Sequence, residues 1–195
     1  MAGLRSVKGM HDILPKEMPA WHYLEDLFRD LVSRYGYEEI RTPILEPLDL
    51  FVRGIGEATD IVDKEMYSFS DKGDARLALR PEGTASVIRS YVQHNLEKVG
   101  PVSKLYYLGP MFRRERPAKG RYRQFYQAGA ELIGVEQASA DAEIISMAVK
   151  FVSSLGIFNV SVQLNSLGDS DTRPAYREAL VDFFGAKTEI LCSDC

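Results

Sequence analysis

Hydrophobic positions in the first part of the chain repeat at the spacing of an α-helix. Apolar residues fall at every third or fourth position over residues 18–35, and Gly36 follows as a natural helix end. This pattern predicts an amphipathic helix. Similar spacing predicts further helices over residues 84–96, over residues 139–155 with Ser139 as N-cap, and over residues 174–184.

Other stretches have the alternation or β-branched content of strands. They cover residues 37–42, 66–70, 76–79 and 158–164, and a turn is expected at residues 71–73. Two longer runs, residues 105–112 and 124–133, flank a segment with Pro117, Lys119 and Gly120. This arrangement predicts an antiparallel hairpin. Its loop is longer than a tight turn requires, which indicates that the loop carries a binding function.

The order of these elements favours an α+β fold. Helices and hairpins without regular β-α-β alternation predict an antiparallel β-sheet flanked by helices. A length of 195 residues, with 45% hydrophobic and 27% charged residues, predicts one globular domain over residues 1–195. Neither a dinucleotide-binding nor a P-loop glycine motif occurs, so a bound nucleotide would be held by side chains such as arginine.

Charge, hydrophobicity and cysteine content argue against several classes of protein. A net charge of −4 argues against a protein that coats nucleic acid, and places any RNA contact at a local basic patch. We find no apolar run long enough for a bilayer and no signal-peptide core, and we therefore expect a cytoplasmic protein. Cys192 and Cys195 form half of a tetrahedral zinc site at most, so we predict no metal site there.

The hairpin loop concentrates positive charge. Residues 113–123 contain six basic side chains against the single acid Glu115; the basic residues are Arg113, Arg114, Arg116, Lys119, Arg121 and Arg123. Such a cluster fits a polyanionic partner, but it also fits a well-solvated turn.

The second strand of the hairpin adds polar groups to an apolar run. Period-two alternation places Phe125, Gln127, Gly129, Glu131 and Ile133 on one face. If Arg113 and Glu115 share that face, the hairpin offers a cation for phosphate, a ring for stacking and acceptors for an amine. A solubilising hairpin would explain the arginines but not Gln127 and Glu131.

Several stretches, in order, resemble one family. FRRE at residues 112–115, the basic loop and Phe125 resemble motif 2 of class II aminoacyl-tRNA synthetases, and RPAKGRYRQF with Glu131 is similar to the histidine-specific family. GYEEIRTPILEP resembles motif 1. The segments DILP, GEATDIVDKEMYSF, LRPEGTA and LNSLGD extend the resemblance to histidyl-tRNA synthetases over nearly the whole chain.

The resemblance implies a function. It implies that histidine is activated with ATP and Mg²⁺ to histidyl-adenylate and transferred to the 3′ end of tRNA(His), by a homodimer built through motif 1. From the pattern alone, motif 1 is equally compatible with a core helix that leads into an edge strand. Motif 3 and the anticodon-binding domain of the family would lie beyond Cys195, so the isolated chain is expected to have little or no activity.

The resemblance also assigns site residues. Arg113 would be the catalytic residue, holding the α-phosphate and the histidine carboxylate. ATP would be bound by Arg113, Glu115, Arg121 and Phe125; histidine by Glu82, Gly83, Thr84, Arg113, Gln127 and Glu131; and tRNA by Arg116 and Lys119. From the residues themselves, Glu82 is also a candidate cap for the helix that starts near Thr84.

Two other functions stay open. One is the synthetase-like regulatory subunit of ATP phosphoribosyltransferase, which shares the fold but is not an enzyme. The presence of Arg113, Glu115, Arg121 and Phe125 together favours the ligase. The other is an RNA-binding or dimerisation module that uses the hairpin only as a basic patch.

Overall fold

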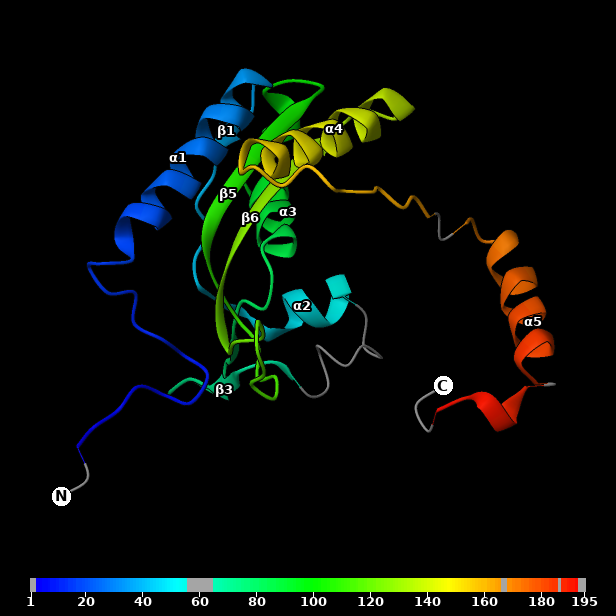
Figure 1. Ribbon diagram of the computed structural model, residues 1–195, viewed down its shortest axis with the longest axis horizontal. Helices are drawn as coiled ribbons and strands as arrows, with labels where there is room; N and C mark the ends of the chain where they lie inside the picture. Colours follow the sequence, from blue (N-terminus) through cyan, green and yellow to red (C-terminus); the bar gives the residue numbers. More distant parts are fainter. Residues whose placement is uncertain (1–2, 56–64, 166–167, 186, 193–195) are drawn as a thin grey trace. The chain divides into compact units, whose positions relative to one another are not determined.

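The computed structural model describes residues 3–55, 65–165, 168–185 and 187–192 (Figure 1). The chain divides into two compact units, Met1–Phe158 and Asn159–Cys195. The first unit contains two three-stranded sheets with helices packed on them, and the second is helical. This arrangement confirms the predicted α+β class.

The larger sheet is built on the predicted hairpin. Its strands are β1 (Glu38–Glu39), β5 (Ser103–Phe112) and β6 (Gln124–Ile133), in the order β1-β5-β6. The antiparallel β5–β6 register runs from Ser103 opposite Ile133 to Phe112 opposite Gln124, which confirms the hairpin. β1 is shorter than the predicted strand and pairs with β5 in parallel, whereas every other strand pairing in the described residues is antiparallel.

The smaller sheet has the order β2-β4-β3 and carries a helix that the sequence pattern did not reveal. Its strands are β2 (Leu45–Pro47), β3 (Ser68–Ser70) and β4 (Arg76–Leu79). The additional helix, α2 (Leu48–Ile55), buries Leu48 and Phe51 against Met66 and Ala78. Eight residues are too few for helical periodicity to stand out from a buried strand or loop. Part of the GEATDIVDKEMYSF segment lies outside the described residues.

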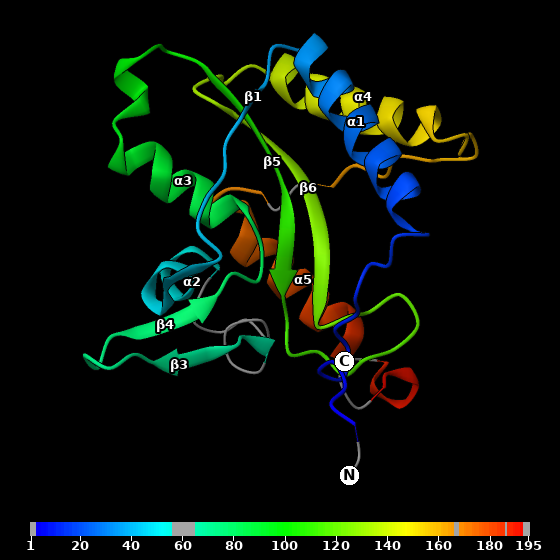
Figure 2. The ribbon, with the colours of Figure 1, turned by 90° about the vertical axis from the view of Figure 1, so that its left-hand side faces the viewer.

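One face of the β5–β6 hairpin is covered by two helices, α1 (Met18–Arg34) and α4 (Ala138–Ser154) (Figure 2). Their buried side chains pack with Tyr106 of β5, and the ring of Phe28 meets that of Tyr106 at 5.9 Å. Both helices confirm predictions. The predicted cap of α4 was wrong, because the helix begins one residue before Ser139 and its N-cap Gln137 makes no side-chain hydrogen bond.

The opposite face of the hairpin packs against α3 (Thr84–Gln93). Val87 of this helix forms a buried cluster with Leu105, Tyr107 and Met111 of β5. The predicted helix over residues 84–96 is confirmed as α3 followed by the short 3-10 helix η2 (Leu96–Lys98). The α helix stops before Asn95, whose backbone adopts a left-handed conformation (φ +52°).

The second unit contains α5 (Thr172–Gly185) and the 3-10 helix η3 (Thr188–Ile190). Asp169 starts α5 by accepting hydrogen bonds from the backbone N–H groups of Asp171 and Thr172. The predicted strand over residues 158–164 was wrong, because this segment is extended, exposed and paired with no described strand. Alternating β-branched residues make a strand only where a neighbouring strand completes the hydrogen bonds.

No helix in the described residues is long and apolar enough to cross a membrane.

The close contact between Gly129 and the ring of Tyr107 can be tested by substitution. A Cβ atom at this position would lie 2.3 Å from Cζ of the Tyr107 ring, so we expect Gly129→Ala to lower the free energy of unfolding by about 1–3 kcal/mol. Urea denaturation measures this change. Gly73→Ala is the matched control, because its Cβ would meet nothing within 4 Å. Equal stability of the Gly129→Ala variant and the unsubstituted chain would show that the contact is not tight.

Candidate functional site

The predicted site residues of β6 share the face that packs against α3. In the β5–β6 register, Gln127 lies opposite Gly109 and Glu131 opposite Leu105. Phe125 packs on the cluster formed with α3, whereas Ala130 and Leu132 pack on the cluster formed with α1 and α4. This confirms the alternation that placed Phe125, Gln127, Gly129 and Glu131 on one face.

Glu131 is tied to the start of α3. The hydroxyl of Thr84 donates a hydrogen bond of 2.7 Å to Oε1 of Glu131. Burial raises the pKa of Glu131, the negative charge of Glu82 acts in the same direction, and the hydrogen bond from Thr84 opposes both. The site therefore contains a half-buried carboxylate with a hydroxyl donor beside it.

Glu82 caps α3, as one of the two interpretations of the sequence predicted. Its carboxylate accepts hydrogen bonds from the backbone N–H of Thr84 at 2.5 Å and of Ala85 at 2.8 Å. These bonds fix the side chain at the positive end of the helix. A carboxylate has about four lone-pair positions, so it can still accept from a ligand after both bonds are made.

Tyr107 completes this part of the site, and the sequence pattern did not single it out. Its side chain is only 5% exposed, and its ring occupies the space that Cβ atoms at Gly83 and Gly129 would need. Burial raises the pKa of the Tyr107 phenol, and the neighbouring Thr84 acts in the opposite direction. The alternation that places Arg113 on the site face also places Tyr107 there and Tyr106 on the other face, but no feature of the sequence marks this tyrosine as a site residue.

Arg80 is a second residue that the sequence did not identify. It is buried, and its guanidinium donates hydrogen bonds to the carbonyls of Pro110, at 3.0 Å, and Thr42, at 2.9 Å. It passes over Gly109, where a Cβ atom would lie 2.5 Å from Nη2. Arg80 therefore fixes the loop before α3 against β5, and desolvation lowers its pKa.

The nucleotide residues predicted from the hairpin also converge. Arg113 donates from Nε to the carbonyl of Pro81 at 2.9 Å, and its guanidinium lies 5.1 Å from the centre of the Phe125 ring. The carboxylate of Glu115 lies between two guanidinium groups. Its Oε1 atom is 3.9 Å from Nη1 of Arg113, and its Oε2 atom is 3.7 Å from Nη1 of Arg121. The cation, ring and carboxylate predicted for one face thus lie together.

Arg116 and Lys119 lie in the loop that joins the two strands. Both are exposed, and neither makes an ion pair or hydrogen bond with another described residue. A reciprocal backbone bridge between Ala118 and Arg121 closes the tip, where Gly120 adopts a positive φ of 81°. The loop therefore presents these two cations to solvent at a closed turn.

Gln127 is a candidate residue with a buried side-chain atom that lacks a hydrogen-bond partner in the described residues. Its Oε1 atom is buried, and no group in the described residues donates to it. A buried acceptor without a donor costs about 1–3 kcal/mol, so its presence in a native site needs a reason. A ligand N–H group would supply one.

The described residues contain no cluster of three or more histidine, cysteine, aspartate or glutamate side chains arranged for a metal ion. Cys192 is exposed, and Cys195 lies outside the described part of the chain.

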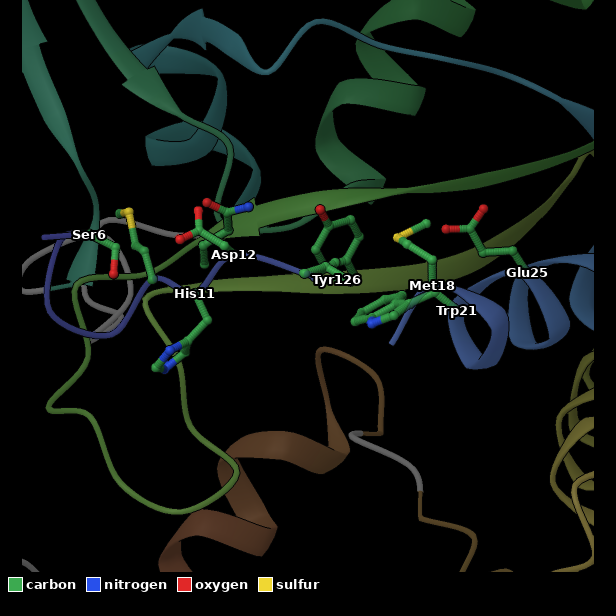
Figure 3. Close-up of a pocket in the computed structure, with 10 residues that line it drawn as sticks. Ser6, His11, Asp12, Met18, Trp21, Glu25 and Tyr126 are labelled. Carbon is green, nitrogen blue, oxygen red and sulfur yellow. The ribbon is translucent and has the colours of Figure 1, made fainter. Parts of the chain in front are cut away.

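A separate cleft of about 440 Å³ opens on the other face of β6 (Figure 3). Trp21 and Met18 of α1, Tyr126 of β6, and Asp12 from the segment before α1 line it, and the rings of Trp21 and Tyr126 are 4.6 Å apart. Tyr126 alternates with Phe125 and Gln127 along β6. None of the predicted site residues contributes to this cleft.

The raised pKa of Glu131 predicts a pH-dependent effect on stability. Because the folded-state pKa of Glu131 is raised, the folded protein binds a proton more readily than the unfolded chain, and its stability falls as pH rises through that window. We expect Glu131→Gln to raise the free energy of unfolding at pH 8 and to have a smaller effect at pH 4. Urea denaturation at both values, with the exposed Glu136→Gln as control, tests this. A loss of stability at pH 8 would contradict it.

Comparison with known proteins agrees with the geometry. The family model for histidyl-tRNA synthetase matches residues 9–171. The histidine–tRNA ligase of Geobacter sulfurreducens is 53% identical over 98% of this chain, and that of Synechococcus elongatus is 52% identical over 94%. The chain spans less than half of these relatives, 46% and 42% of their lengths.

Solved structures give the same result. The apo histidyl-tRNA synthetase of Staphylococcus aureus aligns with a TM-score of 0.76 and 42% identity, over 99% of this chain and 45% of that one. A Bacillus halodurans protein described as an ATP phosphoribosyltransferase regulatory subunit/histidyl-tRNA synthetase aligns with a TM-score of 0.65 and 29% identity, over 76% of this chain and 37% of that one. Sequence motifs, hairpin geometry and these relatives together show that the chain belongs to the histidyl-tRNA synthetase family.

Proposed function

We propose that the chain provides histidine and ATP binding in a histidine–tRNA ligase, as part of its class II catalytic domain. The main support for the proposal is that two pairs of side chains lie on the same face of the hairpin. The Thr84–Glu131 pair supplies polar contacts for an amino acid, and the Arg113–Phe125 pair supplies a cation and a ring for a nucleotide. Membership of the family supports the same assignment.

The amino-acid part of the site fits histidine. Glu131 would accept the N–H of the imidazole, and a ligand without that donor would leave the half-buried carboxylate with Thr84 as its one hydrogen-bond donor in the described residues. The ammonium group has three donors, and three acceptors are available for it in the carboxylate of Glu82, the hydroxyl of Thr84 and the unpaired Oε1 of Gln127. Gly83 contributes by leaving room for Tyr107 beside them.

The nucleotide part of the site fits ATP. Phe125 would stack on adenine, Glu115 would accept from its amino group, and Arg121 would reach the distal phosphates. In the described structure Glu115 is held only by long ion pairs of 3.7 and 3.9 Å. Partly exposed pairs of this kind contribute little, so a nucleotide can replace them at small cost.

The reaction needs positioning and charge neutralisation more than a catalytic base. A carboxylate oxygen of histidine attacks the α-phosphorus, the bond from this phosphorus to the bridging oxygen breaks, and pyrophosphate leaves. Arg113 would hold both the carboxylate and the α-phosphate, bringing like charges together and stabilising the charge that develops. Its Nε bond to Pro81 fixes the guanidinium in place for this role.

Mg²⁺ has no ready-made site in the described residues, which contain no cluster of metal-binding side chains. We propose that Mg²⁺ binds together with ATP and is coordinated by the phosphate oxygens of the nucleotide, which are common Mg²⁺ ligands. The proposed roles of Arg113 and Glu131 do not depend on the metal ion.

The remaining partners follow from the family. Arg116 and Lys119 would meet the phosphates of the tRNA(His) acceptor end, because they are exposed cations at a closed turn. The segment GYEEIRTPILEP would take part in a homodimer, and the cytoplasm is the proposed location.

The regulatory subunit of ATP phosphoribosyltransferase is the second candidate function. It is less well supported, since the ligase relatives are 50–53% identical and the protein whose description includes that subunit is 29% identical.

Glu131 separates the ligase from both alternatives. We expect Glu131→Gln to lower histidine-dependent exchange of pyrophosphate into ATP by about 100-fold or more in kcat/KM, because the amide places its own N–H groups against an imidazole donor. The assay uses a chain of the relatives' full length that includes these residues. Glu97→Gln, at an exposed glutamate of η2, is the control. Unchanged exchange in the Glu131→Gln variant would remove Glu131 from the histidine site, and absence of histidine-dependent exchange in the unsubstituted protein would leave only a binding or regulatory function.

The loop cations have a different expected effect. Replacing Arg116 and Lys119 by alanine is expected to weaken tRNA binding and to reduce the salt dependence of that binding by about one unit of slope per residue, with pyrophosphate exchange unchanged. Filter binding over a range of salt concentrations measures the slope, and Lys150→Ala on the exposed side of α4 serves as control. A slope equal to that of the unsubstituted protein would remove these residues from the RNA interface.

A further inference from the structure

The segment before α1 is attached to the hairpin loop through Gly9. Gly9 is the one buried residue in the described range 3–17, and its carbonyl accepts a hydrogen bond of 2.7 Å from the backbone N–H of Arg123. A longer bond of 3.4 Å joins the same carbonyl to the N–H of Gln124, where β6 begins. The segment is therefore joined to the hairpin at the point where the loop enters the second strand.

The backbone at Gly9 forms a turn that favours glycine. The N–H of Met10 donates to the carbonyl of Val7 at 2.9 Å, and Gly9, the third residue of this turn, has a φ of +85°. A positive φ at the third position is typical of a type II turn, where a residue with a side chain is strained. This turn holds the carbonyl of Gly9 against Arg123.

The space around Gly9 is filled by the loop. A Cβ atom at Gly9 would lie 3.0 Å from Cγ of Pro117 and 3.0 Å from Cγ of Arg123. These two residues belong to the two halves of the loop, so the segment packs on both. The ring of His11 adds an edge contact with the ring of Tyr122, with 4.9 Å between the ring centres. A side chain at Gly9 would therefore displace the loop.

Arg123 links this attachment to the residues proposed to bind the nucleotide. Its carbonyl accepts from the backbone N–H of Arg113 at 3.0 Å, and its Nε donates to the carbonyl of Glu115 at 3.2 Å. Glu115 is the proposed acceptor for the adenine amino group, and Arg121 lies two residues before Arg123 in the loop. A displacement of Arg123 would therefore move Glu115 and Arg121.

The histidine part of the site is held by other contacts. Thr84 bonds to Glu131, and Glu82 bonds to the backbone at the start of α3. The guanidinium of Arg113 is bonded through Nε to the carbonyl of Pro81, which precedes α3. None of these bonds is made with Gly9 or with Arg123, so they can persist when the loop moves.

We propose that Gly9 is a positioning residue that holds the hairpin loop where Glu115 and Arg121 can bind ATP. This inference rests on the proposed ligase function and deepens it. Because Gly9 acts through Arg123 and Pro117, its effect belongs to the binding of ATP and not to the binding of histidine.

Gly9→Ala tests the proposal, and Gly156→Ala is the matched control. The two glycines have nearly the same φ, +85° and +82°, so both variants carry the strain of alanine at positive φ. They differ in their surroundings, because a Cβ atom at Gly156 would meet nothing within 4 Å. In a chain of the relatives' full length that includes these residues, we expect Gly9→Ala to raise the KM for ATP in pyrophosphate exchange about fivefold and to leave the KM for histidine within about twofold. Gly156→Ala should change neither.

A second measurement follows the loop without catalysis. Trypsin can cut the loop after Lys119 and Arg121, which are exposed, and can cut α4 after the exposed Lys150. We expect Gly9→Ala to speed cleavage of the loop about fivefold and to leave cleavage after Lys150 unchanged, because the loop alone loses its attachment. Mass spectrometry of the fragments over time gives the rate at each position.

The outcomes separate the two proposals. An equal KM for ATP in the two variants, an equal rise in the KM for ATP and for histidine, or loop cleavage no faster than in the control would overturn the role of Gly9 and leave the ligase assignment standing. Faster cleavage after Lys150 as well would also overturn it, since Gly9 would then support the whole unit and not the loop. Absence of histidine-dependent exchange in the unsubstituted protein would overturn the ligase assignment and, with it, the role of Gly9 in ATP binding.

Discussion

The contact of the Tyr107 ring with Gly83 and Gly129 is the constraint on which the site depends. It sets the distance between the start of α3 and strand β6, and so brings the hydroxyl of Thr84 to the carboxylate of Glu131. Arg80 supports the same geometry from the other side of the loop, with hydrogen bonds to the carbonyls of Pro110 and Thr42. A close-packed arrangement of this kind resists small displacements, so it holds the polar groups in fixed positions.

The site includes polar groups whose burial destabilises the fold. Glu131 is a half-buried carboxylate with a raised pKa, and Gln127 has a buried oxygen to which no described residue donates a hydrogen bond. Groups of this kind are destabilising, and under the proposed function the N–H donors of histidine would pair with both. Local conflicts with the rules of packing are expected at functional sites. The opposite face of the same strand has no such conflict, because Ala130 and Leu132 pack there on an apolar cluster.

Much of the fold and of the site could be predicted from the sequence, wherever the signal is local. The hairpin, its shared polar face and the cap formed by Glu82 follow from alternation, turn residues and helix-end chemistry. Features set by tertiary packing could not be predicted: α2 is too short to show a period, and residues 158–164 have the composition of a strand but no pairing strand in the described structure. Tyr107 and Arg80 were missed because their importance comes from glycines on neighbouring elements, which periodicity does not reveal.

The sharpest test of the proposed site is a crystal structure of a chain of the relatives' full length that includes these residues, with a non-hydrolysable analogue of histidyl-adenylate. We predict that the imidazole lies within hydrogen-bond distance of Glu131, the ammonium group beside Glu82 and Thr84, and the adenine against Phe125. An analogue bound instead in the cleft between Trp21 and Tyr126, or one whose imidazole does not contact Glu131, would contradict the assignment of this face as the histidine and ATP site.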